Sequence, residues 1–113
     1  MKDFSEIPKE KILLKGKHFF IIPDSFPVSP GHLLIISNSS KKNYFELNKL
    51  EVEELNIMIH ECKKIIEKEY KPDGYNIGMN YGEAAGQTVF QFHCHIIPRY
   101  SDDMKNPKGG VRL

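Results

Sequence analysis

The sequence predicts an α+β protein in which an antiparallel sheet of about five strands packs against one long helix. Short runs rich in β-branched and aromatic residues precede residue 38, a helical period begins near residue 50, and two further strand-like runs follow residue 74. Because the strands and the helix occur in separate runs, an antiparallel sheet is favoured over alternating strands and helices in a parallel arrangement.

Composition indicates the size and setting of the protein. A chain of 113 residues is expected to form a single domain, residues 1–113. Its 16 basic and 15 acidic residues are mixed along the sequence, which argues against polymeric nucleic acid as a partner. The isolated cysteines Cys62 and Cys94 match neither a disulfide scaffold nor a paired zinc motif, and the apolar runs are too short to span a membrane. We therefore expect a soluble cytoplasmic protein.

The first strands are expected before residue 38. Residues 12–14 and 18–22 predict a hairpin with a turn at Gly16. A third strand is expected over residues 32–37, because the segment ahead of it contains the strand breakers Pro23, Pro27, Pro30 and Gly31.

A long helix is predicted from Lys49 to Tyr70. Asn48 and Glu51 have the spacing of a capping box, and Pro72 lies just beyond the expected end. The stripe expected to face the core consists of Val52, Leu55, Met58, Ile59, Cys62, Ile65 and Ile66.

Two more strands, residues 75–81 and 89–97, are expected to be antiparallel neighbours joined by residues 82–88. Alternation in the second strand would place Gln91, His93 and His95 on one face, with Cys94 in the core on the other. Alternate residues are about 6.5 Å apart along a strand, which suits side chains gathering around one phosphate. The polar residues 101–113 are expected to form an extended C-terminal arm.

Paired histidines alone leave other interpretations open. Two partly exposed strand histidines would give the same pattern, and His93, His95 and His32 would together offer three nitrogens to zinc. No carboxylate or cysteine completes an evident ligand set in the sequence, so we predict no metal site.

The residues around the histidines resemble a known family. Residues 80–99 closely resemble the signature of the histidine triad superfamily of nucleotide hydrolases and transferases, and residues 30–35 resemble its upstream Pro-Gly-His strand. Residues 106–112 look like the tail of bacterial-type members similar to diadenosine tetraphosphate hydrolases. The resemblance implies the histidine triad fold, with a short helix beside the long one, and a homodimer. The central match is Gly86-Gln87-Thr88-Val89-Phe90-Gln91-Phe92-His93-Cys94-His95-Ile96-Ile97-Pro98-Arg99.

The chain departs from the family pattern at Gln91, where the first triad histidine normally stands. The resemblance makes His93 the nucleophile that attacks the α-phosphorus and forms a nucleotidyl-histidine intermediate. It also implies that the backbone carbonyl at residue 91 accepts the other ring N–H of the nucleophile, which a glutamine carbonyl does equally well. Because an amide does not titrate, we expect Gln91 to change pH dependence or leaving-group preference before it abolishes activity.

The resemblance also implies roles for the remaining candidates. His95 and His32 would stabilise charge or transfer a proton near the phosphate. The other predicted contacts are Gln87 and Thr88 to phosphate oxygens, Gly86 as a close backbone approach, Asp24 to the ribose and Asn80 to the nucleotide. An exposed turn carboxylate is an alternative interpretation of Asp24. Candidate walls for the base are Phe4, Ile7, Phe20 and Ile22.

Three functions stay open at this point. The leading one is hydrolysis of dinucleoside polyphosphates such as diadenosine tetraphosphate at the α-phosphate. The alternatives are a nucleoside phosphoramidase or purine nucleotide hydrolase, and a nucleotide-binding sensor with little catalysis. No cofactor is expected to be required, and magnesium is expected only as a companion of a polyphosphate substrate. The sequence does not specify the base preference or the cellular role.

Overall fold

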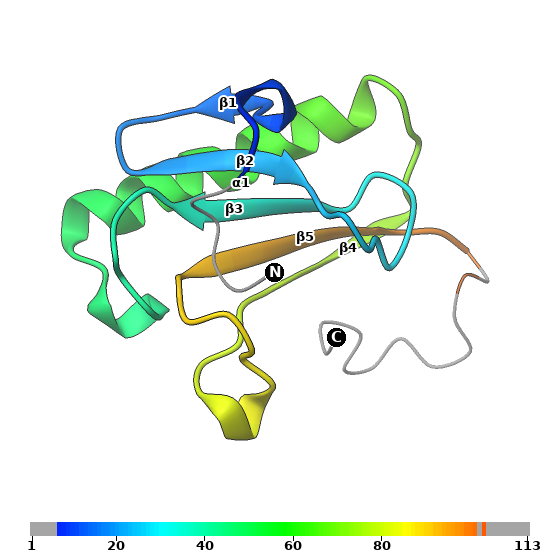
Figure 1. The fold of residues 1–113 in the computed structure, drawn as a ribbon. Helices are drawn as coiled ribbons and strands as arrows, with labels where there is room; N and C mark the ends of the chain where they lie inside the picture. Colours follow the sequence, from blue (N-terminus) through cyan, green and yellow to red (C-terminus); the bar gives the residue numbers. More distant parts are fainter. Residues whose placement is uncertain (1–6, 102, 104–113) are drawn as a thin grey trace.

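The fold is a five-stranded antiparallel sheet with one long helix packed on one of its faces (Figure 1). The computed structural model describes residues 7–101 and 103. The strand order is β1-β2-β3-β5-β4, and every neighbouring pair is antiparallel, which confirms the predicted fold class. The strands are β1 Leu14–Lys15, β2 Phe19–Pro23, β3 Leu33–Ser37, β4 Gly74–Gly78 and β5 His93–Arg99.

The long helix, α1, spans Lys49–Glu67 and begins at the predicted capping box. The Asn48 side chain accepts the Glu51 N–H at 2.9 Å, and the Glu51 carboxylate accepts the Asn48 N–H at 2.8 Å. The helix ends three residues earlier than predicted, because Lys68, Glu69 and Tyr70 form a closing turn on the carbonyls of residues 65 and 66. Short helical structure takes the form of three 3-10 turns in the described part of the chain: η1 Lys9–Lys11, η2 Tyr44–Glu46 and η3 Glu83–Ala85.

The two faces of the sheet have different coverings. The helix-side face packs its buried side chains against α1, and Cys94 belongs to this core, as predicted. Its members are Phe19, Ile21, Leu33, Ile35, Leu55, Met58, Cys62, Ile66, Phe92, Cys94 and Ile96. The opposite face has a smaller cluster of Phe20, Ile22, Leu34 and Ile36, against which Ile7, Ile12 and Val89 pack.

The strand predicted over residues 89–97 begins later than expected. β5 starts at His93, so Gln91 lies ahead of the strand and the expectation that it shares a strand face with His93 and His95 is wrong. The reason is that the Phe92 N–H bonds to the Lys41 carbonyl outside the sheet, at 2.7 Å. The partner strand β4 ends at Gly78 and pairs there with His95, so no ladder with β4 extends to residue 91.

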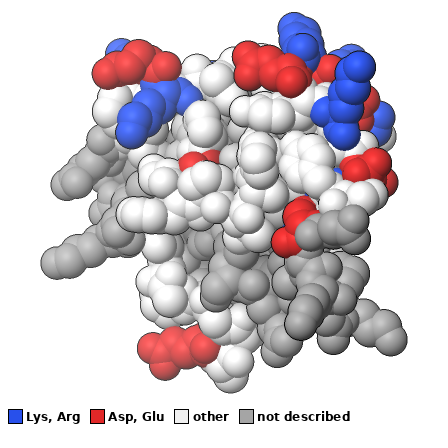
Figure 2. Space-filling model, turned by 90° about the vertical axis from the view of Figure 1, so that its right-hand side faces the viewer, with Lys and Arg blue, Asp and Glu red and all other residues white. Residues whose placement is uncertain are grey.

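The surface carries mixed charge. Basic and acidic side chains lie next to one another along the upper margin of the face in Figure 2, and further acidic side chains lie lower on that face. Among the described residues, no helix combines the length and apolar character needed to cross a bilayer. The predicted C-terminal arm falls on residues that, apart from 101 and 103, lie outside the described part of the chain, as does Phe4.

Candidate active site

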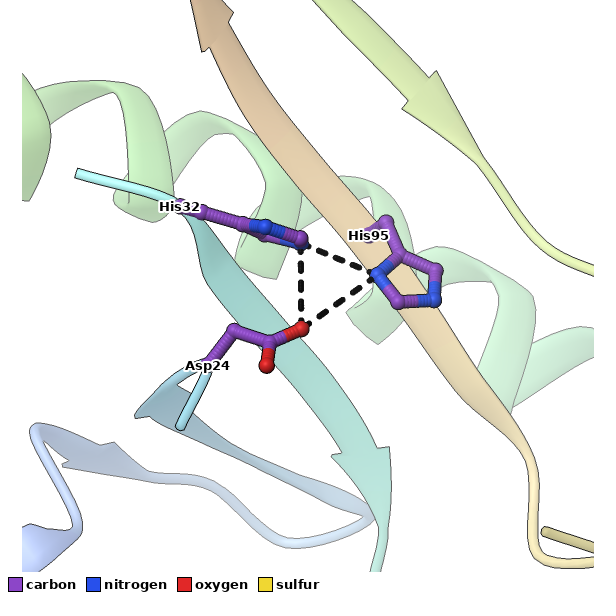
Figure 3. Close-up of side chains that lie close together, drawn as sticks. All are labelled: Asp24, His32 and His95. Atoms are coloured by element: carbon purple, nitrogen blue, oxygen red, sulfur yellow. Dashed lines mark hydrogen bonds and ion pairs between the residues drawn. The ribbon is translucent and has the colours of Figure 1, made fainter. Parts of the chain in front are cut away.

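Three ionisable side chains, each in a different strand or next to one, meet at one end of the sheet (Figure 3). Asp24 follows β2, His32 precedes β3 and His95 lies in β5. Strand pairing brings them together, because the Asp24 N–H bonds to the His32 carbonyl and His95 lies opposite Leu34. His32 Nε2 is 3.0 Å from His95 Nδ1 and 3.3 Å from Asp24 Oδ2, and His95 Nδ1 is 3.8 Å from the same oxygen.

Hydrogen bonds assign the tautomers of the two rings. The Val28 N–H donates to His32 Nδ1 at 3.1 Å, so the proton of the neutral His32 ring is on Nε2. This Nε2–H donates to His95 Nδ1, which places the proton of the neutral His95 ring on its own Nε2. Figure 3 shows this second nitrogen directed away from Asp24 and His32. His95 therefore has an N–H donor on the side away from the cluster.

Both rings of the cluster are kept neutral by their surroundings. Burial, with smaller contributions from the neighbouring His93 and His32, lowers the pKa of His95 to about 3. Burial also lowers the pKa of His32, against the opposing effect of the Asp24 carboxylate. At neutral pH His95 is therefore an uncharged hydrogen-bond donor.

The same cluster is a candidate metal site by proximity. Asp24, His32 and His95 place one ligand atom each within 4.8 Å of one another. The set considered from the sequence was His32, His93 and His95, so Asp24 replaces His93 as the third possible ligand. The tautomers argue against a metal ion here. A ligating nitrogen must offer its lone pair, whereas His32 Nε2 carries the proton as long as Val28 donates to Nδ1.

His93 lies beside this cluster, half-buried, with its ring centroid 5.2 Å from that of His95. His93 Nδ1 donates to the Gln91 carbonyl at 2.9 Å, so the hydrogen bond expected from residue 91 is present. The lone pair of the neutral ring is consequently on Nε2, the nitrogen that a nucleophile needs. The Gln91 side chain donates to the Ser37 carbonyl at 2.7 Å and thereby ties the orienting carbonyl to the end of β3.

A cavity of about 260 Å³ on the opposite face joins the histidines to an apolar wall. A second cavity, of about 280 Å³ near the C-terminal end of α1, also touches Asp24 and His32 but lacks His93, so we assign the chemistry to the first. The first is lined by Ile22, Asp24, Ser25, Phe26, Leu34, Thr88, Val89, His93 and His95.

Comparison with known proteins identifies the family. The family model described as "HIT domain" matches residues 5–102. The chain belongs to the HIT domain family. This HIT domain is 38% identical over 107 residues to an uncharacterized HIT-like protein of Methanocaldococcus jannaschii, with 93% of this chain and 80% of the relative covered. It is 28% identical to the AP-4-A phosphorylase of Mycobacterium tuberculosis over 88% of this chain and 54% of the relative.

The chain is also similar to proteins of known structure. The diadenosine triphosphate hydrolase of Plasmodium falciparum, solved in complex with cyclomarin A, superposes with a TM-score of 0.81 at 28% identity, covering 91% of this chain and 70% of that one. This HIT domain spans 58%, 60% and 54% of the length of three of the curated relatives that it matches.

The loop between β4 and β5 of this HIT domain is held together by Gln87. Its buried amide accepts the Gly82 N–H at 2.8 Å and donates to the carbonyls of Lys42 and Val89 at 2.7 and 3.2 Å. A bond from this amide to a phosphate would require one of these donor bonds to break. Gly82 and Gly86 have φ of 84° and 91°, a region that favours glycine, so the loop path depends on them.

The predicted site residues separate into two groups. The structure brings Asp24, His32, Thr88, His93 and His95 to one cavity or its cluster. The second group, Asn80, Gly86, Gln87 and the Gln91 side chain, does not line the cavity, and the predicted substrate contacts of its members stay predictions.

Sequence reasoning missed part of the cavity wall. Ile22 was a candidate and lines the cavity, whereas Ser25, Phe26 and Leu34 were not considered. The available signal was the position of Ser25 and Phe26 directly after Asp24, in the segment between two predicted strands.

Proposed function

We propose that this HIT domain hydrolyses nucleotides at the α-phosphorus through a nucleotidyl-histidine intermediate. The observation that carries the proposal is the geometry of His93: its Nδ1 donates to the Gln91 carbonyl, which leaves the nucleophilic lone pair on Nε2, in a ring whose centroid is 5.2 Å from that of His95.

In the first step His93 Nε2 attacks the α-phosphorus and forms a P–N bond. The bond from phosphorus to the leaving-group oxygen breaks, and that oxygen departs with the electron pair. The modified ring carries a positive charge, which its Nδ1–H shares with the Gln91 carbonyl. The Nε2–H of His95 donates to the phosphate oxygens on which negative charge builds up.

In the second step water attacks the same phosphorus. The P–N bond breaks, its electron pair returns to His93, and the water proton passes to solvent. The products are a nucleoside monophosphate and the leaving group, and both rings return to the tautomers described above. Each oxygen of the Asp24 carboxylate keeps a second lone pair, with which it accepts a ribose hydroxyl in the proposed complex.

Dinucleoside polyphosphates are the proposed substrates. A polyphosphate leaves as a stable anion and needs no proton, whereas an amine leaving group must be protonated. Burial lowers the pKa of His95 to about 3, and a neutral donor of this kind supports the anhydride more than the phosphoramidate. The names of the Mycobacterium and Plasmodium relatives point the same way. Magnesium enters only as the companion of the polyphosphate.

The test compares products from diadenosine tetraphosphate and adenosine phosphoramidate by chromatography. We expect adenosine monophosphate and adenosine triphosphate from the first substrate, and a loss of at least about a thousand-fold in kcat for His93→Ala. His60→Ala is the matched control, because His60 is an exposed histidine on α1 outside the cavity. Preference for the phosphoramidate would promote that alternative. Nucleotide binding without His93-dependent turnover would make the protein a sensor.

A homodimer is also proposed, through the edge of the sheet that β4 forms. β4 is a terminal strand in the strand order, and Ile77 on it is 48% exposed. An edge strand with an exposed apolar side chain is suited to pairing with a second copy. Light scattering after gel filtration should give twice the chain mass for the unmodified protein and the monomer mass for Ile77→Lys; a monomeric unmodified protein would contradict the proposal.

A further inference from the structure

The segment between β2 and β3 ends in a turn of defined type beside the last residues of β5 (Figure 1). The turn consists of Ser29-Pro30-Gly31-His32, and the His32 N–H donates to the Ser29 carbonyl at 3.2 Å. Gly31 has φ of 93° and follows a proline. Proline at the second position and a glycine with positive φ at the third are the features of a type II β-turn, which differs from type I in the orientation of the peptide between these two residues.

The carbonyl of this central peptide has a side-chain partner from another part of the chain. The Tyr100 hydroxyl, directly after β5, donates to the Pro30 carbonyl at 2.7 Å. Tyr100 is itself held by the Asp103 carboxylate, which accepts the Tyr100 N–H at 2.8 Å and an N–H of Arg99 at 2.7 Å. In a type I turn the same carbonyl would point to the other side of the turn. The hydroxyl therefore stabilises the type II form selectively.

Two further contacts hold the turn against β5. The Ser29 hydroxyl donates to the Pro98 carbonyl. Gly31 fits closely against the neighbouring rings, because a Cβ added to it would come within 3.1 Å of Tyr70 and 3.2 Å of Pro98. A larger residue at this position would be strained by the positive φ as well. Substitution of Gly31 thus disturbs the same turn without removing the Tyr100 hydroxyl.

The turn brings together the two groups that set the tautomer of His32. Val28 immediately precedes the turn, His32 is its last residue, and the Val28 N–H donates to His32 Nδ1 at 3.1 Å. Because the chain reverses between these residues, rotation of the central peptide would move the donor relative to the ring. His32 Nε2 is in turn 3.0 Å from His95 Nδ1, the bond that keeps the proton of His95 on Nε2.

We propose that Tyr100 is a positioning residue whose hydroxyl, through the Pro30 carbonyl, holds the turn that fixes the His32 tautomer. The N–H donor of His95 thereby depends on a residue that does not line the cavity. The inference rests on the proposed function, which gives that donor its use. Loss of Tyr100 should consequently lower kcat and leave KM nearly unchanged. The net contribution of one neutral hydrogen bond corresponds to a factor of about two to ten.

The experiment compares Tyr100→Phe, which removes the hydroxyl and keeps the ring, with the unmodified protein. Nitrogen-15 NMR of the histidine rings detects the tautomers without turnover, and the ratio of the Nε2–H to the Nδ1–H form of His32 should fall about two- to ten-fold. The kcat for diadenosine tetraphosphate should fall by a similar factor. Tyr75→Phe is the matched control, because the Tyr75 hydroxyl donates to Glu67 Oε2 at 2.8 Å and Tyr75 does not line the cavity. This variant should leave the His32 spectrum and kcat unchanged.

Gly31→Ala disturbs the turn independently of the hydroxyl. We expect the same change in the His32 tautomer and a larger one than in Tyr100→Phe, because alanine is strained at this φ and its Cβ meets Tyr70 and Pro98. A change in Gly31→Ala with none in Tyr100→Phe would overturn the positioning role of Tyr100. Equal changes in Tyr100→Phe and Tyr75→Phe would also overturn it, because the effect would then be one of general stability.

The outcomes separate this inference from the proposed function. If turnover depends on His93 but Tyr100→Phe keeps the His32 tautomer and kcat, the positioning role alone is overturned. If the unmodified protein shows no His93-dependent turnover, the proposed function is overturned and with it the use of the His95 donor. The ring spectra of Tyr100→Phe then still show whether the hydroxyl fixes the His32 tautomer.

Discussion

The two faces of the sheet are built from the same strands, but one face packs against α1 and the other carries the cavity with the histidines. On β3, Ile35 and Ile36 are both fully buried, but Ile35 packs under α1 and Ile36 lies on the face of the cavity. On β5, Cys94 is in the helix-side core between His93 and His95, which face the site. The comparison teaches that side-chain alternation along one strand supplies buried residues to both faces, which stabilise the fold alike, and confines the catalytic histidines proposed here to one of them.

The largest of these effects is expected for kcat, from a substitution on the cavity face of the sheet. His95→Asn removes the imidazole donor, and kcat should fall roughly 100- to 10,000-fold, the range seen when a positioned proton donor is lost. Steady-state kinetics on diadenosine tetraphosphate measures this, with circular dichroism to confirm that the fold is kept. Activity within a few-fold of the unmodified protein would show that the His95 N–H is not used.

Substitutions at Ile35 and Ile36, adjacent residues of β3 on opposite faces, test the difference between the two faces directly. Ile35→Ala and Ile36→Ala should each lower the free energy of unfolding by about 2–5 kcal/mol, because both delete buried side chains. Only Ile36→Ala should also lower kcat/KM per folded molecule, since Ile36 is the strand partner of His93. Denaturant unfolding and kinetics below the transition give both quantities. Equal loss of kcat/KM in the two variants would remove the distinction between the faces.

The third prediction concerns the stability of the fold at low pH. Burial lowers the pKa of His95 to about 3, against an ordinary value of 6.5, so between these values the unfolded chain binds one proton more than the folded one. Stability should be fully present above pH 6.5 and fall as the pH is lowered toward 3, by up to about 1.4 kcal/mol per pH unit from this group. Unfolding in urea at several pH values measures the slope. His95→Asn should have the shallower slope; identical slopes would mean that His95 titrates normally.

The smallest effect is expected at Gln91, just ahead of β5. Gln91→His keeps the carbonyl that orients His93 and adds a titrating ring, so we expect kcat within about three-fold at pH 8 and a new ionisation near pH 6.5 in the pH–rate profile. A profile unchanged from pH 5 to 8 would show that the side chain at residue 91 does not influence the reaction.

Features of this fold that depend only on residues close together in the sequence were predictable. The capping box at Asn48 and Glu51 needs only side-chain spacing, and the placement of Cys94 in the core needs only alternation around it. The start of β5 was not predictable, because it depends on a bond from the Phe92 N–H to Lys41, far away in the sequence.

In the candidate site, too, contacts between residues far apart in the sequence were not predictable. His93 and His95 are identified by their motif, but the contact of Asp24 with His32 and His95 comes from the pairing of strands. The ring tautomers depend on a backbone donor at Val28, which the sequence does not reveal. The same is true of the exposure of Phe26 at the cavity rim.

The amide of Gln87 has a consequence for the thermodynamics of binding. Because it already joins Gly82, Lys42 and Val89, the loop before β5 has given up its conformational entropy during folding. A nucleotide that contacts Thr88 in this loop does not have to order it, and rigidity present before binding spares that entropic cost. Calorimetric entropies of binding should therefore become less favourable when Gln87 is replaced by alanine, even where the enthalpy is unchanged.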